Sequence, residues 1–88
     1  MTYQVAWTSP ARRDLTRLPP RIVTVIMTYV DERLTENPQR LSKVLQGSLN
    51  GLRSARSGDY RVLFRLDEES KHLFIIRVNH RAHAYRPR

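Results

Sequence analysis

A glycine–aspartate dipeptide at 58–59 separates two runs that are typical of β-strands, residues 52–57 and 60–66. A two-residue loop that begins with glycine is typical of a type II′ hairpin turn, and this turn fixes which residues of the two strands face each other. Arg56 is therefore predicted to lie directly opposite Arg61. One side of the hairpin, predicted to face the core, carries Ala55, Val62, Phe64 and Leu66, and the other side carries Ser54, Arg56, Arg61, Leu63 and Arg65.

Two helices are predicted before the hairpin. Ser9 followed by Pro10 is typical of an N-cap and the first position of a helix, and the prolines at 19 and 20 end that helix and begin the next. The first helix is expected to bury Ala11, Leu15 and Leu18 and to expose Arg12, Arg13, Asp14 and Arg17. The second, over residues 21–34, has an apolar stripe that a core-facing role explains better than a ligand site. That stripe consists of Ile22, Val23, Ile26, Met27, Val30 and Leu34.

The remaining pattern completes the predicted fold. Residues 3–7 and 73–78 are expected to form strands, and residues 39–51, which include two glycines, are expected to form a loop. The order is an N-terminal strand, a two-helix hairpin and an antiparallel β-meander. This order predicts an α+β fold with the helices packed on one face of the sheet. A chain of 88 residues is expected to form a single domain, residues 1–88.

Charge is the property that bears most directly on function. Sixteen basic residues stand against eight acidic ones, for a net charge of +8, and only Lys43 and Lys71 among the sixteen are lysines. This balance predicts a polyanionic partner, either nucleic acid or an acidic protein. With no cysteine and three histidines, no metal or other cofactor is expected. No run approaches the length of a membrane span and no signal-peptide core is evident, so a cytoplasmic location without membrane contact is expected.

The predicted Arg56–Arg61 pair needs an explanation, because like charges directly opposite each other destabilise a sheet by up to ~1 kcal/mol. Both guanidinium groups could be solvated and splay apart. Alternatively, this face could be an anion site whose forked donors bind phosphate oxygens. The run Asn-His-Arg-Ala-His-Ala-Tyr-Arg at 79–86 adds two imidazoles, a phenol and two guanidiniums near a strand end. Their concentration favours the anion site.

Three segments together resemble a known protein family. They are TSPARRDLTRLP, LQGSLNGLRSARSGDYRVLFRL and VNHRAHAY, and they are similar to the RelE/ParE superfamily of toxins from type II toxin–antitoxin systems. The spacing and the closing HRxxxY are more similar to the RelE branch, especially its actinobacterial members. The resemblance implies a RelE-like fold and a metal-independent, ribosome-dependent mRNA endonuclease that inhibits translation. It also implies three partners: the ribosome, mRNA and an acidic antitoxin, RelB-like or Phd/YefM-like.

The same resemblance implies roles for individual residues. Arg56 and Arg61 would act at the scissile phosphate, Arg81 at the phosphate or leaving group, and Tyr85 would stack on the substrate nucleotide. Ser54 falls where some members carry a second lysine or arginine, so the chain departs from the family pattern there. Since guanidinium groups stay protonated, the candidates for proton transfer are His80, His83 and Tyr85, with His83 ranked first. RNA or ribosome contacts are expected from Arg12, Arg13, Arg17, Arg53, Arg65 and His80.

Two other functions fit the sequence. A ParE-like inhibitor of DNA gyrase would act by binding alone, and would depend on an N-terminal helical surface and not on the arginine set. A catalytically weak member or a plain basic RNA-binding module would need the charge but no chemistry. Whether activity requires the residues implied for catalysis therefore distinguishes the mRNA endonuclease from these two alternatives.

Overall fold

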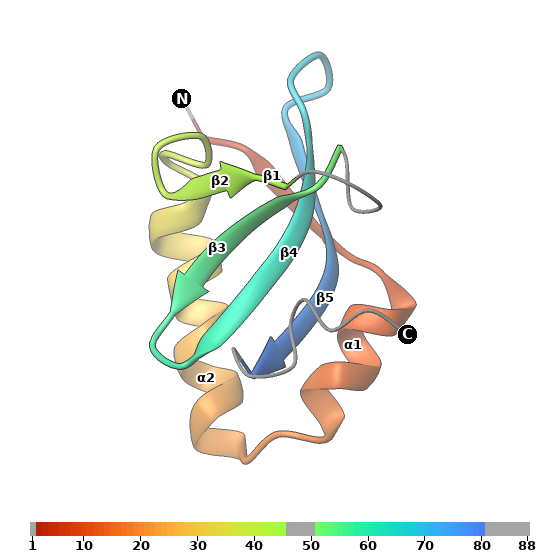
Figure 1. Cartoon of the computed structure of the whole chain (residues 1–88), viewed down its shortest axis with the longest axis vertical. Helices are drawn as coiled ribbons and strands as arrows, with labels where there is room; N and C mark the ends of the chain where they lie inside the picture. The colour runs from red at the N-terminus through yellow and green to blue at the C-terminus, as the bar shows by residue number, and fades with distance from the viewer. Residues whose placement is uncertain (1, 46–50, 81–88) are drawn as a thin grey trace.

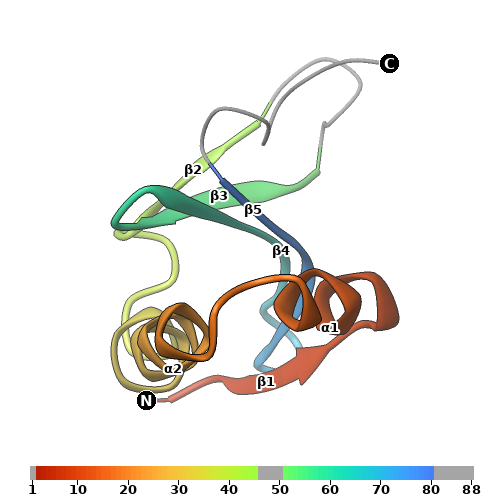
Figure 2. The same cartoon turned by 90° about the horizontal axis from the view of Figure 1, so that it is seen from below.

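The computed structural model describes residues 2–45 and 51–80, and it forms one five-stranded sheet with two α-helices packed against a single face (Figures 1 and 2). The strand order is β1-β5-β4-β3-β2, with β1 parallel to β5 and the other neighbours antiparallel. The predicted α+β class is confirmed. The elements are β1 (Gln4–Trp7), α1 (Ser9–Thr16), α2 (Pro20–Tyr29), the π-helical η1 (Val30–Leu34), β2 (Ser42–Val44), β3 (Arg53–Ser57), β4 (Tyr60–Asp67) and β5 (His72–His80).

The hairpin of β3 and β4 has the predicted register, including the pairing of Arg56 with Arg61. Gly58, the first residue of the turn, has a positive φ of 60°. Asp59, the second, does not have a positive φ; among the described non-glycine residues, only Lys71 does. A positive φ at the first turn position alone is the type II′ pattern, and glycine adopts it without a steric cost. The turn therefore fixes which side chains face the core.

The core lies between the helices and the sheet. Phe64, Val62 and Ala55 of the hairpin are almost completely buried, as predicted, and Leu66 packs beside them at partial exposure. Burial of each large apolar side chain stabilises the fold by about 1.5–3 kcal/mol. The other members of the cluster are Ala11, Ile26, Val30 and Leu34 from the helical segments, and Leu73, Ile75 and Val78 from β5.

A bulge in β5 allows side chains from both halves of this strand to pack in the core. Leu63 pairs with Arg77 and Phe64 pairs with Ile75, so Ile76 has no partner in β4. An extra residue shifts the alternation of side chains by one position. Ile75 and Val78 consequently both reach the core, although three positions separate them.

The second helical segment ends at Leu34, as predicted, but its last turn is π-helical. The N–H of Thr35 donates to the carbonyl of Val30 at 3.1 Å, a bond across five residues. Val30 and Leu34 are both fully buried. The apolar stripe is narrower than predicted, because Met27 is 38% exposed.

Two predictions about local structure are wrong. The first helix begins at Ser9 itself, with Thr8 before it, because the Thr8 hydroxyl binds β5 and the carbonyl of Thr8 accepts the first helical hydrogen bond from Arg12. Residues 39–51 are not only a loop, since they include β2, an edge strand of three residues that pairs with β3. Over the described residues, no helix is long and apolar enough to cross a membrane.

Candidate nucleic-acid interface

The face of the sheet opposite the helices carries a cleft that contains the arginine pair. Its volume is about 370 Å³, and it lies where β2, β3 and β4 meet. No acidic side chain of residues 2–45 or 51–80 lines it. The lining residues are Arg40, Leu41, Ser42, Lys43, Ser54, Arg56 and Arg61. Four cationic side chains around one hollow can bind phosphate groups through charge-assisted hydrogen bonds.

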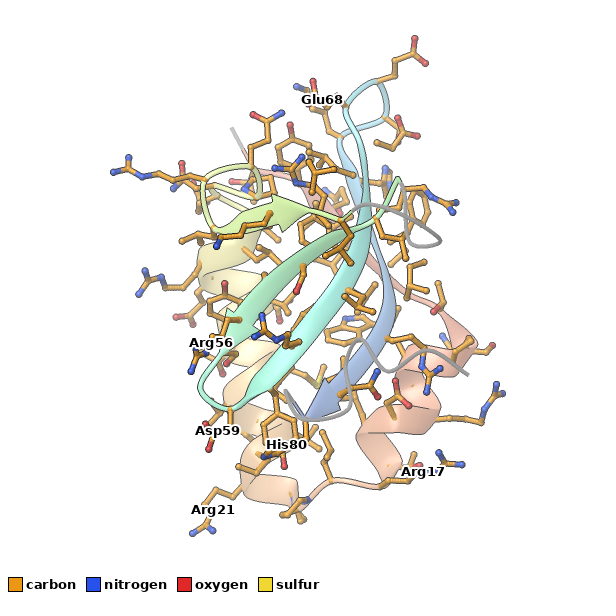
Figure 3. All side chains as sticks on the ribbon, in the orientation of Figure 1. Arg17, Arg21, Arg56, Asp59, Glu68 and His80 are labelled. Atoms are coloured by element: carbon orange, nitrogen blue, oxygen red, sulfur yellow. The ribbon has the colours of Figure 1, made fainter. Side chains whose placement is uncertain are left out.

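The hairpin turn helps to orient Arg56. Its Nε donates a hydrogen bond to the carbonyl oxygen of Gly58 at 3.0 Å, while the side chain as a whole is exposed. Arg61, its partner across the strands, is half-buried, and its Nε atom is shielded from solvent. A guanidinium held at the Nε side presents its two terminal nitrogens in a defined direction, which suits a phosphate better than a freely rotating chain does. Figure 3 shows Arg56 close to the β3–β4 turn, which also carries Asp59.

Two residues of the cleft, Arg40 and Lys43, were not among the predicted site residues. They come from the segment that was expected to be a loop. In the structure, Lys43 lies in β2 directly opposite Ser54, and pairing between strands places both on the face of Arg56 and Arg61. No local pattern in the sequence of this segment indicates an edge strand, so its contribution to the cleft becomes visible only from the strand pairing.

Arg53 lies on the other face of β3 from Arg56, and it holds the start of β2 in place. Its Nε donates to the Ser42 hydroxyl at 2.7 Å, and its Nη2 donates to the carbonyl of Gln39 at 3.3 Å. The Ser42 hydroxyl in turn donates to the carbonyl of Pro38 at 2.5 Å. The structure therefore shows Arg53 supporting the wall of the cleft and does not bring it together with Arg56 and Arg61.

Other predicted residues lie apart from the cleft. Arg65 is exposed and lines a different hollow, whose other residues include Asp67 and Glu68. His80 packs edge-on against the Tyr60 ring, with centroids 5.4 Å apart, and shares the helix-covered face with Val78. Arg81, His83 and Tyr85 lie outside the described residues.

Arg12 and Arg13 of α1, and Arg17 directly after it, are exposed, as predicted, but they belong to the helical side of the molecule. Arg12 donates to the carbonyl of Trp7 at 2.9 Å and to the Ser9 hydroxyl at 3.4 Å. Arg13 and Arg17 project into solvent, and Figure 3 shows Arg17 at the helical end of the molecule, well away from Arg56. They do not form part of the cleft.

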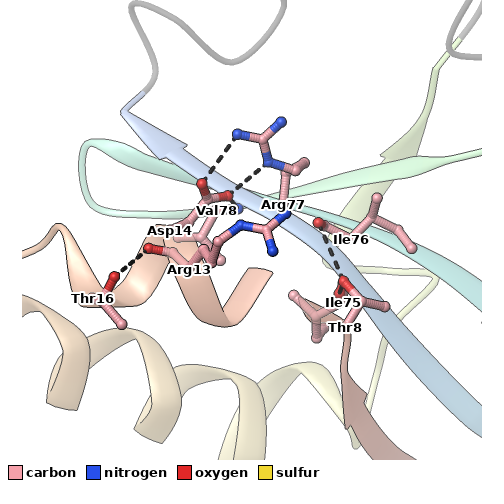
Figure 4. Close-up of polar contacts among 8 residues, drawn as sticks. All are labelled: Thr8, Arg13, Asp14, Thr16, Ile75, Ile76, Arg77 and Val78. Carbon is pink, nitrogen blue, oxygen red and sulfur yellow. Dashed lines mark hydrogen bonds and ion pairs between the residues drawn. The ribbon is translucent and has the colours of Figure 1, made fainter. Parts of the chain in front are cut away.

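Asp14, predicted to be exposed, is instead buried, with 6% of its side chain accessible. Its carboxylate accepts hydrogen bonds from the N–H of Val78 at 2.8 Å, from Arg77 Nε at 2.9 Å and from Arg77 Nη2 at 3.1 Å (Figure 4). These hydrogen bonds raise the pKa of Arg77 above its ordinary value. The Asp14 carboxylate thus binds a backbone N–H of β5 and a guanidinium group at the same time.

The position of Asp14 follows from the length of β1. That strand pairs with β5 only as far as Ile75, and the next residue, Thr8, donates to the Ile75 carbonyl through both its N–H at 3.1 Å and its hydroxyl at 2.7 Å. Beyond this point the edge of β5 would present unpaired backbone groups. Helix α1 covers that edge, and Asp14 takes the N–H of Val78. The end of β5 is thereby fixed next to the arginine pair, since Asn79 faces Arg61.

Fold and cleft together define the class: a small basic α+β protein whose open sheet face carries a cleft lined by four cationic side chains. Within the described parts of the chain, no group of three or more histidine, aspartate or glutamate side chains gathers as metal ligands would.

Residues 5–85 match the family described as the ParE toxin of the type II toxin–antitoxin system parDE. Two toxins of Mycobacterium tuberculosis are similar. Toxin RelG is 45% identical over 86 residues, which cover 98% of this chain and 99% of that protein. Toxin RelE is 44% identical over 84 residues, which cover 96% and 87% respectively.

Among solved structures, the toxin–antitoxin complex RelBE2 from the same organism includes a chain that matches with a TM-score of 0.88 and 43% identity. The match covers 92% of this chain and all of that one. The chain belongs to the ParE toxin family and is a type II toxin of the RelE kind, as its resemblance implied.

Proposed function

We propose that this toxin is a ribosome-dependent mRNA endonuclease that inhibits translation by cutting mRNA in the ribosomal A site. The observation that carries the proposal is the cleft on the open face of the sheet, where Arg56 and Arg61 lie side by side and the described part of the chain places no carboxylate in the wall. A fold does not gain stability from such a pair, whereas a phosphate group would compensate both charges.

The chemistry that suits these groups is transesterification within the RNA chain. The 2′-OH loses its proton as its oxygen forms a bond to the adjacent phosphorus, the bond from phosphorus to the 5′-oxygen breaks, and that oxygen gains a proton. The products are a 2′,3′-cyclic phosphate and a 5′-OH. Negative charge builds up on the nonbridging oxygens in the transition state, and preorganised guanidinium groups stabilise it. Arg61 and Arg56 are assigned this role.

Proton transfer needs other groups, because guanidinium does not give up its proton. The segment after β5 supplies the first-ranked candidate, His83, as acid or base. The same segment supplies Arg81, assigned to charge stabilisation at the leaving oxygen, and Tyr85, assigned to stack on a nucleobase. These assignments follow the family resemblance. In-line alignment of the 2′-oxygen, the phosphorus and the 5′-oxygen is assigned to the ribosome, so the isolated toxin is expected to cut free RNA poorly.

The proposed partners are the ribosome, mRNA and an acidic antitoxin, with a cytoplasmic site of action. A net charge of +8 and a cleft without carboxylates support a partner that supplies carboxylates. The RelBE2 relative was solved as a toxin–antitoxin complex, which fits this arrangement. Expression of the toxin alone should therefore arrest growth, and co-expression of the acidic protein that binds it should restore growth.

The test is to map mRNA 5′ ends on translating ribosomes after induction of the toxin. Wild type should give discrete cuts within codons, and Arg61→Ala should greatly reduce their yield. Arg21→Ala is the matched control, because it removes the same charge from the exposed start of α2, away from the cleft. Intact mRNA with altered DNA supercoiling, or loss of toxicity with Arg21→Ala but not with Arg61→Ala, would overturn the proposal and point to gyrase.

A further inference from the structure

We propose that Lys43 is a further substrate-contacting residue, whose ammonium group binds the phosphate of the cleaved RNA from the β2 side of the cleft. This inference rests on the proposed function and extends it to a strand that the family resemblance did not single out. It starts from the position of β2, which forms one edge of the sheet and one wall of the cleft.

Strand register places Lys43 on the same face as the arginine pair. Lys43 is the Cα partner of Ser54, which precedes Arg56 by two residues, and Arg56 is the partner of Arg61. Directly paired residues and those two apart along a strand share one face of a sheet. The lysine therefore lies diagonally across from Arg56, within reach of the same ligand.

The side chain between them leaves room for that ligand. Ser54 is small and 6% exposed, and it forms part of the cleft lining between Lys43 and the arginines. A larger residue at 54 would fill the hollow of about 370 Å³ that separates the cations. The opening is thus bordered by Lys43 on one side and by Arg56 and Arg61 on the other.

Charge provides the second argument. Within residues 2–45 and 51–80, neither Lys43 nor Arg40 forms an ion pair, and the exposed Lys43 has an aliphatic stem that extends from a strand. The other lysine, Lys71, lies at the β4–β5 turn with its Nζ 5.3 Å from the centre of the Tyr3 ring. One lysine thus has a partner within the fold, whereas the other faces a cleft lined with like charges. A polyanionic ligand is the partner that Lys43 fits.

Arg40 shares the cleft, but its backbone lies before β2, whereas both neighbours of Lys43 belong to the strand. Position in a paired strand limits where the side chain can reach, and preorganisation of this kind is what a phosphate contact needs. Lys43 is therefore assigned the contact, and Arg40 a supporting charge at the entrance.

The experiment measures single-turnover cleavage of A-site mRNA on programmed ribosomes at saturating toxin. Lys43→Gln should lower the cleavage rate about 10- to 100-fold, below the effect of a fully enclosed donor because Lys43 is exposed. Lys43→Arg, which keeps the charge, should recover most of the rate. Lys71→Gln is the matched control and should cleave like wild type. Circular dichroism and urea unfolding should show that all three variants are folded.

A phosphorothioate at the scissile linkage distinguishes a phosphate contact from a structural role. The measured quantity is the slowing of cleavage by the sulfur atom, which a purely structural role of Lys43 would leave unchanged. Substitution of the contacted nonbridging oxygen should slow wild type and Lys71→Gln, and that slowing should largely disappear in Lys43→Gln. The inference is overturned if Lys43→Gln cleaves at the wild-type rate, or if it weakens only ribosome affinity and leaves the saturated rate unchanged. If wild type does not cleave ribosome-bound mRNA, the proposed function fails as well; if Arg61→Ala alone stops cleavage, only the Lys43 inference fails.

Discussion

Arginine serves opposite purposes in two regions of this sheet. At the β5 edge, Arg77 contacts the buried carboxylate of Asp14, which also binds the strand backbone. At the β2–β3–β4 cleft, Arg56 and Arg61 lie side by side, and none of the residues that the structure places in the lining is acidic. The first arrangement satisfies its charges within the fold. The second gathers like charges at an open cleft, where a phosphate group can bind.

The comparison gives a physical criterion for choosing functional arginines in a chain that has fourteen of them. An arginine paired to a buried carboxylate contributes to stability, and its removal leaves the carboxylate without a counter-ion. An arginine directly opposite another arginine adds like-charge repulsion to the sheet, and a bound anion would reduce that repulsion. Substitutions in the two regions should consequently change different measurable quantities.

The largest effect is expected on cleavage, in the cleft. Arg61→Ala should lower ribosome-dependent cleavage about 10²- to 10³-fold, because one preorganised donor to the developing charge is lost. Arg61→Lys should fall between that variant and wild type, since it keeps the charge but loses the planar fork. The free energy of unfolding should change by less than about 1 kcal/mol in both, because relief of repulsion across the strands offsets lost packing. Cleavage rates and urea titrations of the same preparations check both expectations. A large loss of stability in Arg61→Ala would contradict the assignment of Arg61 to ligand binding and not to stability.

The next effect is on stability, at the β5 edge. Asp14→Ala should lower the free energy of unfolding by about 2–3 kcal/mol, because the buried N–H of Val78 and the Arg77 guanidinium both lose their acceptor. The measurement is urea unfolding followed by circular dichroism. Asp31→Ala, an exposed aspartate on η1, is the control and should stay close to wild type. An Asp14→Ala protein as stable as the control would show that α1 does not need this carboxylate to cover the strand.

The same two regions show what sequence could and could not predict. The Arg56–Arg61 register was predictable because a turn of two residues, with glycine at 58, connects the paired strands directly. Asp14 was misassigned because its partner is Arg77, 63 residues away, and a helix pattern gives no sign of a strand edge that needs an acceptor. Lys43 was missed for a related reason: β2 has three residues, and its pairing with β3 defines it more than its own pattern does.

A smaller effect is expected from the cationic partner of Asp14. Arg77→Ala should cost about 1 kcal/mol of stability, less than Asp14→Ala, because the Arg77 side chain is 45% exposed and the N–H of Val78 still has its acceptor. Cleavage per folded molecule should stay near the wild-type rate. Arg61→Ala is the same substitution in the other region. Arg61→Ala should lose cleavage and keep its stability, whereas Arg77→Ala should lose stability and keep its cleavage rate. If Arg77→Ala abolished cleavage while it left stability intact, the assignment of Arg77 to structure would be wrong.

The smallest effect is expected from an exposed carboxylate, Asp67, which sharpens the contrast with buried Asp14. Hydrogen bonds from Ser70, first its side chain and then its backbone N–H, hold the pKa of Asp67 below its ordinary value, and the N–H of Glu69 adds to them at 3.1 Å. A carboxylate whose pKa is lower in the folded than in the unfolded state stabilises the fold above the unfolded value, and this contribution disappears as pH falls through the folded value. Asp67→Asn should therefore melt slightly below wild type near neutral pH, with the difference vanishing in acid. Thermal melts of both proteins between about pH 7 and about pH 2 test this, with Glu69→Gln in the same turn as the control, because that change keeps the backbone donor. A melting difference that persisted unchanged at the lowest pH would mean that Asp67 stabilises the turn by something other than its charged form.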